Sequence, residues 1–180
     1  MDAISPGRGN SVLVTPGGAQ QRVNIPALRN LAGGIAPTTS VAVDGTLNAY
    51  TAAAGVFAAF GPGDVIDVTG FTTAANNGRK RVTAVTATQL FVSDAALSTD
   101  AAETDITINR LRLPSYVMLV SDSIVPKANL WGCDFGTPPA STTAFFVGSG
   151  APLVLYSAGY DQVIVDGASG NVTVTPLENG

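Results

Sequence analysis

Residues 63–93, GDVIDVTGFTTAANNGRKRVTAVTATQLFVS, constrain the fold of this chain more than any other stretch. The β-branched run Asp64–Val68 predicts one strand. Arg79–Val85 predicts a second, because its side chains alternate between two faces as those of a strand do. Gln89–Ser93 predicts a third strand. The turn signal Asn76–Gly78 favours a tight connection, since Asn and Gly tolerate positive φ, and we therefore expect an antiparallel meander.

The same stretch contains a pattern of Gly, Asp, Asn and alternating apolar residues. Its members are Gly63, Asp64, Ile66, Val68, Gly70, Phe71, Ala74, Asn76, Asn77, Gly78, Val82 and Val85. With the segment 55–60 before it, the pattern resembles a module of tailed-bacteriophage virion proteins, notably tail-tube and head- or tail-accessory proteins. The resemblance covers roughly residues 41–112. It implies a structural protein of the virion, assembled in the cytoplasm of the bacterial host.

Charged residues are scarce in this chain. They make up 12 % of it, against about 25 % in an average soluble protein. A surface with so little charge suggests that partners cover much of it, which favours a homo-oligomer or a lattice component. A compact all-β domain with a polar but uncharged surface of Ser, Thr and Asn remains the alternative.

Composition also argues against several classes of function. The net charge of −4 argues against a surface that binds nucleic acid. The chain has no histidine and one cysteine, Cys133, so it lacks the commonest general base, a zinc ligand set and an intrachain disulfide. No signal peptide is expected, and no apolar stretch approaches the ~20 residues that span a bilayer. We expect no enzyme, no cofactor and no membrane partner.

The predicted fold class is all-β, with three parts. Residues 1–40 are expected to form an extended arm, because Gly and Pro interrupt them too often for long elements. Residues 41–113 are expected to form the β-meander module, a small sandwich or barrel. Residues 114–180 are expected to form a second β unit, since short candidate strands alternate there with Gly- and Pro-rich turns.

Four segments outside the meander carry more specific expectations. Ile25–Leu31 is predicted to form a helical turn with Pro26 in its first turn. Leu47–Phe60 has both helix and strand signals, and we favour a pair of strands. Asp94–Asp105 is predicted to be a polar loop. Ile106–Leu113 is predicted to be a strand with a bulge, because its apolar face changes midway.

The second β unit is predicted to contain short strands. They are Tyr116–Val120, Asn129–Phe135, Thr143–Val147, Leu153–Tyr156, Gln162–Val165 and Asn171–Thr175.

Candidate contacts between subunits come from three places. The apolar residues of the arm would lie across a neighbour, Arg79 and Arg81 share a strand face that suits an acidic patch, and Phe146 is expected on the opposite face from Phe145. The full set is Val12, Val14, Ile25, Leu28, Leu31, Arg79, Arg81 and Phe146. A terminus packed on its own chain and a charged edge strand are the alternatives for the first two groups.

The function expected from these features is structural. The first hypothesis is a capsid decoration or cement protein that binds itself and other virion proteins, such as the major capsid protein, by many weak contacts. The second is a tail or tail-tube component. The third is a receptor- or glycan-binding module of a fibre or spike, motivated by aromatic residues in the carboxy-terminal unit. These are Trp131, Phe135, Phe145, Phe146, Tyr156 and Tyr160.

Overall fold

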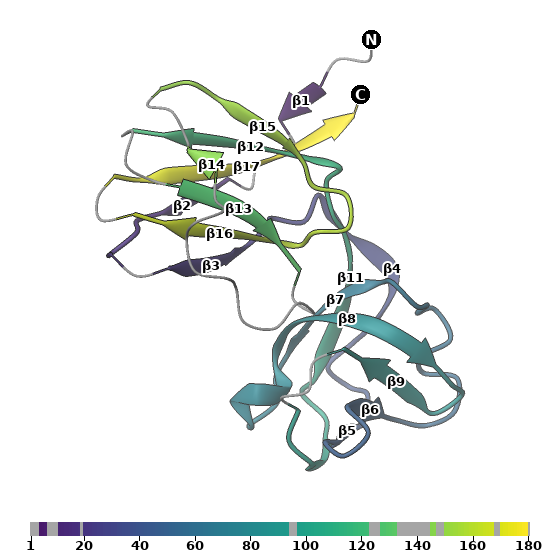
Figure 1. The fold of residues 1–180 in the computed structure, drawn as a ribbon. Helices are drawn as coiled ribbons and strands as arrows, with labels where there is room; N and C mark the ends of the chain where they lie inside the picture. Colours follow the sequence, from purple (N-terminus) through teal and green to yellow (C-terminus); the bar gives the residue numbers. More distant parts are fainter. Residues whose placement is uncertain are drawn as a thin grey trace. The chain divides into compact units, whose positions relative to one another are not determined.

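The computed structural model describes residues 4–6, 11–18, 20–93, 97–122, 127–132, 145–146, 150–167 and 170–179. In these residues the chain forms strands, turns and one 3-10 turn, η1 (Ala74–Asn76), and no α-helix, so the all-β prediction is confirmed. Figure 1 shows two compact units. One unit comprises Met1–Leu28 and Leu113–Gly180, and the other comprises Arg29–Arg112. We call them the split unit and the inserted unit.

The inserted unit is one antiparallel sheet in the order β10-β5-β6-β9-β8-β7-β11-β4. Its strands curl around a common interior (Figure 1), which Tyr50, Phe57, Ile66, Leu90 and Ile108 fill. The strands are β4 (Arg29–Ile35), β5 (Val41–Asp44), β6 (Ala49–Thr51), β7 (Val65–Thr69), β8 (Gly78–Val85), β9 (Gln89–Val92), β10 (Asp100–Glu103) and β11 (Thr107–Arg112).

The predicted meander is confirmed, but its first connection is not the expected tight turn. Strand β7 pairs with β8 and β8 with β9, all antiparallel. Between β7 and β8 the chain makes a wider loop that contains η1, and Gly78 with φ 91° begins β8. The side chain of Asn77 holds this loop, since Oδ1 accepts from Phe71 N at 3.0 Å and Nδ2 donates to Phe71 O at 2.7 Å.

The predicted polar loop Asp94–Asp105 is wrong over its second half. Asp100–Glu103 forms β10, which pairs with β5 at the end of the sheet. The strand is polar because its carboxylates accept hydrogen bonds from the loop after β7. Glu103 accepts from Thr72 N and Oγ1, and Asp100 accepts from Asn76 Nδ2.

Two other predictions in the inserted unit have mixed outcomes. The strand with a bulge is confirmed, because β11 shifts register against β4 between Ile108 and Arg110. The pair of strands over Leu47–Phe60 is wrong beyond β6. There the chain makes successive four-residue turns, each closed by a bond from the N–H of residue i+3 to the C=O of residue i, and the rings of Phe57 and Phe60 are buried against each other at a centroid distance of 6.2 Å.

The split unit is a sandwich of two antiparallel sheets. One has the order β1-β17-β12-β15, with β2 also paired to β17, and the other has the order β14-β13-β16-β3. Figure 1 shows the two layers, and residues such as Leu119, Val163 and Val174 fill the space between them. The strands are β1 (Ile4–Pro6), β2 (Val12–Val14), β3 (Gln21–Asn24), β12 (Tyr116–Ser121), β13 (Lys127–Trp131), β14 (Phe145–Phe146), β15 (Leu153–Tyr156), β16 (Gln162–Asp166) and β17 (Val172–Asn179).

The predicted strands of the carboxy-terminal region are therefore present wherever the structure describes them. Residues 114–180 do not form a unit on their own, however, because β2 and β3 from the amino-terminal segment complete both sheets. The inserted unit also begins at residue 29 and not at 41.

The extended arm over residues 1–40 is corrected. Its strands β1 and β2 pair with β17, β3 pairs with β16, and β4 pairs with β11 of the inserted unit. The helical turn over Ile25–Leu31 is also wrong, since Ile25 N donates to Asp161 O at 2.8 Å and Arg29 begins β4. Before residue 29, strands of three or four residues fit between the Gly and Pro residues, and β4 continues for seven residues through Gly33 and Gly34. All of these strands satisfy their backbone groups across the sheets.

Candidate interaction surface

One outward sheet face of the split unit carries apolar side chains. In β12 the buried residues Val117 and Leu119 point inward, so Tyr116, Met118 and Val120 point outward. Residues that are partners across a sheet share a face, which extends this surface over the neighbouring strands. We call its apolar part the apolar face, and it comprises Leu13, Tyr116, Met118, Val120, Val154 and Tyr156. Strand β17 crosses the same side of the sheet with Thr173, Thr175 and the buried Leu177, so two threonines lie between Leu13 and the outward residues of β12.

The apolar face departs from the usual pattern of a solvated sheet. An antiparallel sheet with one wet face alternates apolar and polar residues. Here Tyr116–Val120 and Leu153–Tyr156 are apolar at every position, as in sheets that are covered on both sides. Leu13, Val154 and Tyr156 are 65 %, 46 % and 62 % exposed. The exposed part of the apolar face is therefore made of these three side chains, next to the half-buried Tyr116, Met118 and Val120.

The edges of this sheet are held by polar side chains. Ser11 Oγ and Thr175 Oγ1 lie 2.8 Å apart next to β2. Asp122 accepts from Asn171 N at 2.6 Å and from Asn171 Nδ2 at 2.7 Å. The donation from Asn171 N, and then that from its side chain, lowers the pKa of Asp122 below its ordinary value. These bonds tie the start of β2 to the middle of β17 and the end of β12 to the start of β17.

A groove of about 460 Å³ lies beside the apolar face. It is lined by Asn129, Leu130, Leu155, Tyr156 and Tyr160. Because β13 and β15 belong to different sheets, the groove lies between the two layers of the sandwich. Its described lining contains no charged side chain.

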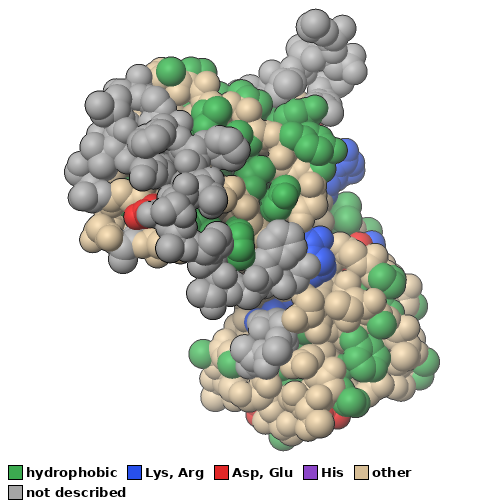
Figure 2. All heavy atoms as spheres, viewed as in Figure 1, with side chains coloured by type: hydrophobic (Ala, Val, Ile, Leu, Met, Phe, Trp, Pro, Cys, Tyr) green, Lys and Arg blue, Asp and Glu red, His purple; other side chains and the backbone are tan. Residues whose placement is uncertain are grey.

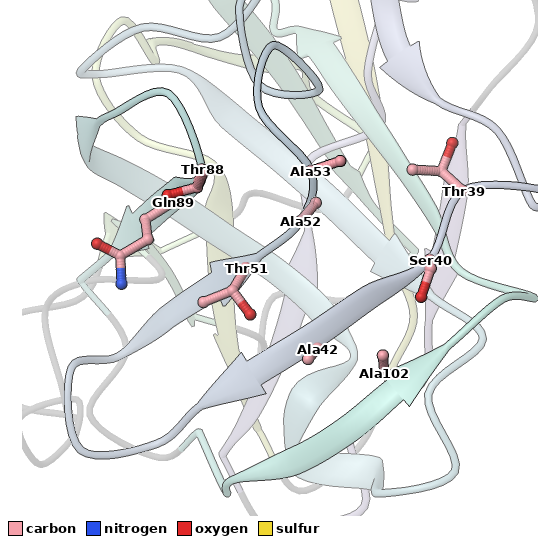
Figure 3. Close-up of a pocket in the computed structure, with 9 residues that line it drawn as sticks. All are labelled: Thr39, Ser40, Ala42, Thr51, Ala52, Ala53, Thr88, Gln89 and Ala102. Atoms are coloured by element: carbon pink, nitrogen blue, oxygen red, sulfur yellow. The ribbon is translucent and has the colours of Figure 1, made fainter.

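The inserted unit has a shallow trough of about 500 Å³, shown in Figure 3. Ala42, Thr51 and Gln89 form a row in register across β5, β6 and β9. The lining consists of Thr39, Ser40, Ala42, Thr51, Ala52, Ala53, Thr88, Gln89 and Ala102. These small uncharged side chains make a smooth surface and contain no acid–base pair.

Several residues of the Gly, Asp and Asn pattern in residues 63–85 hold the structure of the inserted unit. Asn76 is fully buried, and its Oδ1 accepts from Ser98 N at 2.9 Å while its carbonyl accepts from Tyr50 Oη at 2.8 Å. Asp64 accepts from Arg110 Nε at 2.9 Å and Nη2 at 3.3 Å, and from Gly61 N at 2.8 Å. These side chains hold loops against strands, so the pattern specifies a fold and not a ligand site.

The eight candidate contacts have different environments. They lie in β2 and the segment after β3, in β4, in β8 and in β14, as Val12, Val14, Ile25, Leu28, Leu31, Arg79, Arg81 and Phe146. Val14 and Ile25 are wrong as contacts in this fold, since both are buried in the core of the split unit. Val12 is 37 % exposed at the sheet edge. The side chain of Phe146 is outside the described residues, as are Cys133 and Phe135.

The remaining candidates are partly covered by their own chain. Leu28, Leu31, Arg79 and Arg81 are half-buried, and their role as contacts stays a prediction. Lys80 points to the other side of β8, is buried, and donates to Ala75 O at 3.2 Å.

Most of the apolar face was missed by sequence reasoning. The signal was the continuous apolar runs Tyr116–Val120 and Leu153–Tyr156, which break the alternation of a strand that has one wet side.

Within the described ranges, no cluster of three or more His, Cys, Asp or Glu side chains could hold a metal ion. No helix in the same ranges is long and apolar enough to cross a membrane. No protein-family model, curated protein or solved structure matches the chain. The surfaces themselves therefore carry the functional argument.

Proposed function

We propose that this chain is a non-enzymatic structural protein of a tailed-phage virion, and that it decorates the capsid by docking its apolar face on neighbouring subunits. The observation that carries the proposal is the apolar face, whose exposed Leu13, Val154 and Tyr156 lie on one sheet. The scarcity of charge agrees with it. Figure 2 shows mostly green and tan side chains on the described surface, with few blue or red ones.

Magnitudes favour repeated weak contacts over one strong contact. Burying a fully exposed Leu, Val or similar side chain contributes about 1.5–3 kcal/mol. Because Leu13, Val154 and Tyr156 are only about half exposed, together they supply roughly 3–5 kcal/mol. Association itself costs about 4–15 kcal/mol in lost translational and rotational freedom. A single apolar face is therefore marginal, whereas a symmetric lattice that engages several copies at once binds well.

Placement in the tail is the second candidate. Strand β4 pairs only with β11 among the described strands and lies at the end of its sheet. An edge strand of this kind can pair with a strand of another subunit, which is one way to build a ring. Imaging a labelled chain on intact particles by negative-stain electron microscopy separates the two placements, since label over the head supports decoration and label along the tail supports the second candidate.

The apolar face is tested by placing charge on it. We expect the double variant Leu13→Asp/Val154→Asp to bind particles that lack this protein at least about tenfold more weakly, because a buried unpaired carboxylate costs several kcal/mol. Co-sedimentation with such particles measures this. The matched control is Leu47→Asp, which replaces an apolar residue of 48 % exposure in the inserted unit. Undiminished binding of the double variant, with both variants still folded, would refute the proposal.

A further inference from the structure

The groove beside the apolar face has a chemistry that the proposed decoration role does not use. Asn129 and Leu130 come from β13, Leu155 and Tyr156 come from β15, and Tyr160 comes from the turn that follows β15. Strand β14 pairs with β13 only at its first two residues, so the described part of β14 stops short of Asn129.

The Tyr156 ring and the backbone turn that carries Tyr160 are both held by contacts within the chain. The ring of Tyr156 packs edge-on against Tyr116, with centroids 5.3 Å apart and planes at 64°. Tyr160 N donates to Ser157 O at 2.9 Å, and buried Ser157 Oγ donates to Pro114 O at 3.0 Å. A ring that is already ordered loses little conformational entropy when it binds a ligand.

The described lining of the groove combines apolar surface with hydrogen-bonding groups and contains no charged side chain. Leu130 and Leu155 supply the apolar part, and the Tyr156 side chain is 62 % exposed. Asn129 Oδ1 accepts from Leu130 N at 2.9 Å, whereas Asn129 Nδ2 and Tyr156 Oη form no hydrogen bond within the described part of the chain. Two polar groups are thus available to a ligand next to an exposed aromatic ring.

We propose that this groove binds a neutral saccharide. A pyranose ring has an apolar face of C–H groups, which pack on the electron-rich face of an aromatic ring, and a rim of hydroxyls, which match an amide and a phenol. An ionic ligand would find no counter-charge in the lining, and a purely apolar ligand would leave the amide without a partner. The volume of about 460 Å³ lies in the range of roughly 300–1,000 Å³ typical of small-molecule sites.

Binding is tested with the intact chain. The probes are the neutral sugars methyl β-galactopyranoside, methyl α-glucopyranoside, lactose and maltose, with sialyllactose as the anionic comparison. We expect at least one neutral sugar to bind with a Kd near or below the millimolar range, as a single weak site does. Isothermal titration calorimetry and chemical-shift changes of the tyrosine rings measure this.

Variants then assign the site. We expect Tyr156→Ala and Tyr160→Ala each to weaken binding of the best neutral sugar about tenfold, while Tyr156→Phe stays within about threefold because it keeps the ring. The matched control is Leu47→Ala in the inserted unit, which should leave binding unchanged. Circular dichroism melting shows whether each variant is folded.

Three outcomes would overturn the saccharide site: no neutral sugar binds, sialyllactose binds better than lactose, or both alanine variants bind as the unaltered chain does. The inference stands apart from the decoration role. Tyr160 lies outside the apolar face, so Tyr160→Ala should lose the sugar and keep particle binding, whereas Leu13→Asp/Val154→Asp should do the opposite.

Discussion

The two units place their polar and apolar side chains differently. In the inserted unit, side chains such as Asn76, Asn77 and Asp64 form internal hydrogen bonds, and the trough on the surface is lined by small uncharged residues. In the split unit, the outer side of one sheet carries the solvent-exposed side chains of Leu13, Val154 and Tyr156. The polar side chains of the inserted unit thus hold its own loops, whereas the split unit leaves apolar side chains exposed, where we propose that a partner binds.

An ion pair shows how the inserted unit holds its own strands together. The inserted unit contains the bidentate pair of Asp64 and Arg110, with the guanidinium 5.8 Å from the centre of the Phe60 ring and donating to Ala32 O at 3.2 Å. That cluster ties β11, β4 and the loop before β7 together. Internal ties of this kind fix the shape of a unit, whereas exposed apolar side chains gain free energy only when a partner removes them from water.

The largest expected effect separates the two faces of β12. Leu119 is fully buried and Met118, its neighbour, points outward. Leu119→Ala should lower the free energy of unfolding by about 2–5 kcal/mol, because it leaves a cavity. Met118→Ala should lower it by about 1 kcal/mol or less. The single tryptophan, Trp131, lies in the split unit, so its fluorescence during urea unfolding measures both. Equal losses would show that Met118 is part of the core and would remove it from the apolar face.

The next effect concerns the internal ties of the inserted unit. Asn76→Ala should lower the free energy of local opening around β8 and β10 by about 2–3 kcal/mol, because Ser98 N and Asp100 lose their buried hydrogen-bond partner. Hydrogen exchange of the β8 and β10 amides measures this. The control is Thr83→Ala on the exposed side of β8, which should stay within about 0.5 kcal/mol. A change for Asn76→Ala no larger than that of the control would mean that the loop does not depend on its Asn side chain.

The smallest effect is a pH dependence in the split unit. Asn171 lowers the pKa of Asp122, so the carboxylate form stabilises the fold above the ordinary value near 3.8, and this stability is lost as the pH falls through the lower folded value. Thermal melting between about pH 2 and 5 should therefore show a steeper decline for the unaltered chain than for Asp122→Asn. Parallel declines would indicate that the Asp122–Asn171 bonds add nothing to the stability of this edge.

Local signals made the meander and the carboxy-terminal strands predictable. Alternation in Arg79–Val85 and the short β-rich run Leu153–Tyr156 are properties of neighbouring residues. Strand β10 was missed because Asp100 and Glu103 resemble loop residues until their partners Asn76 and Thr72 are known. The candidate site was predicted least well, since Val14 and Ile25 were expected outside and lie in the core.

By itself the sequence determined that this chain is all-β, poor in charge and without histidine chemistry, because composition and short-range periodicity suffice for those conclusions. Only the tertiary structure decided which apolar residues are exposed and that both ends of the chain build one unit. The pairing of Val14 with Val172 and of Tyr116 with Tyr156 joins residues far apart in the chain. Such pairs are determined by the packing of whole sheets. A three-residue strand such as β2 is too short to show a periodicity from which its pairing partner could be predicted.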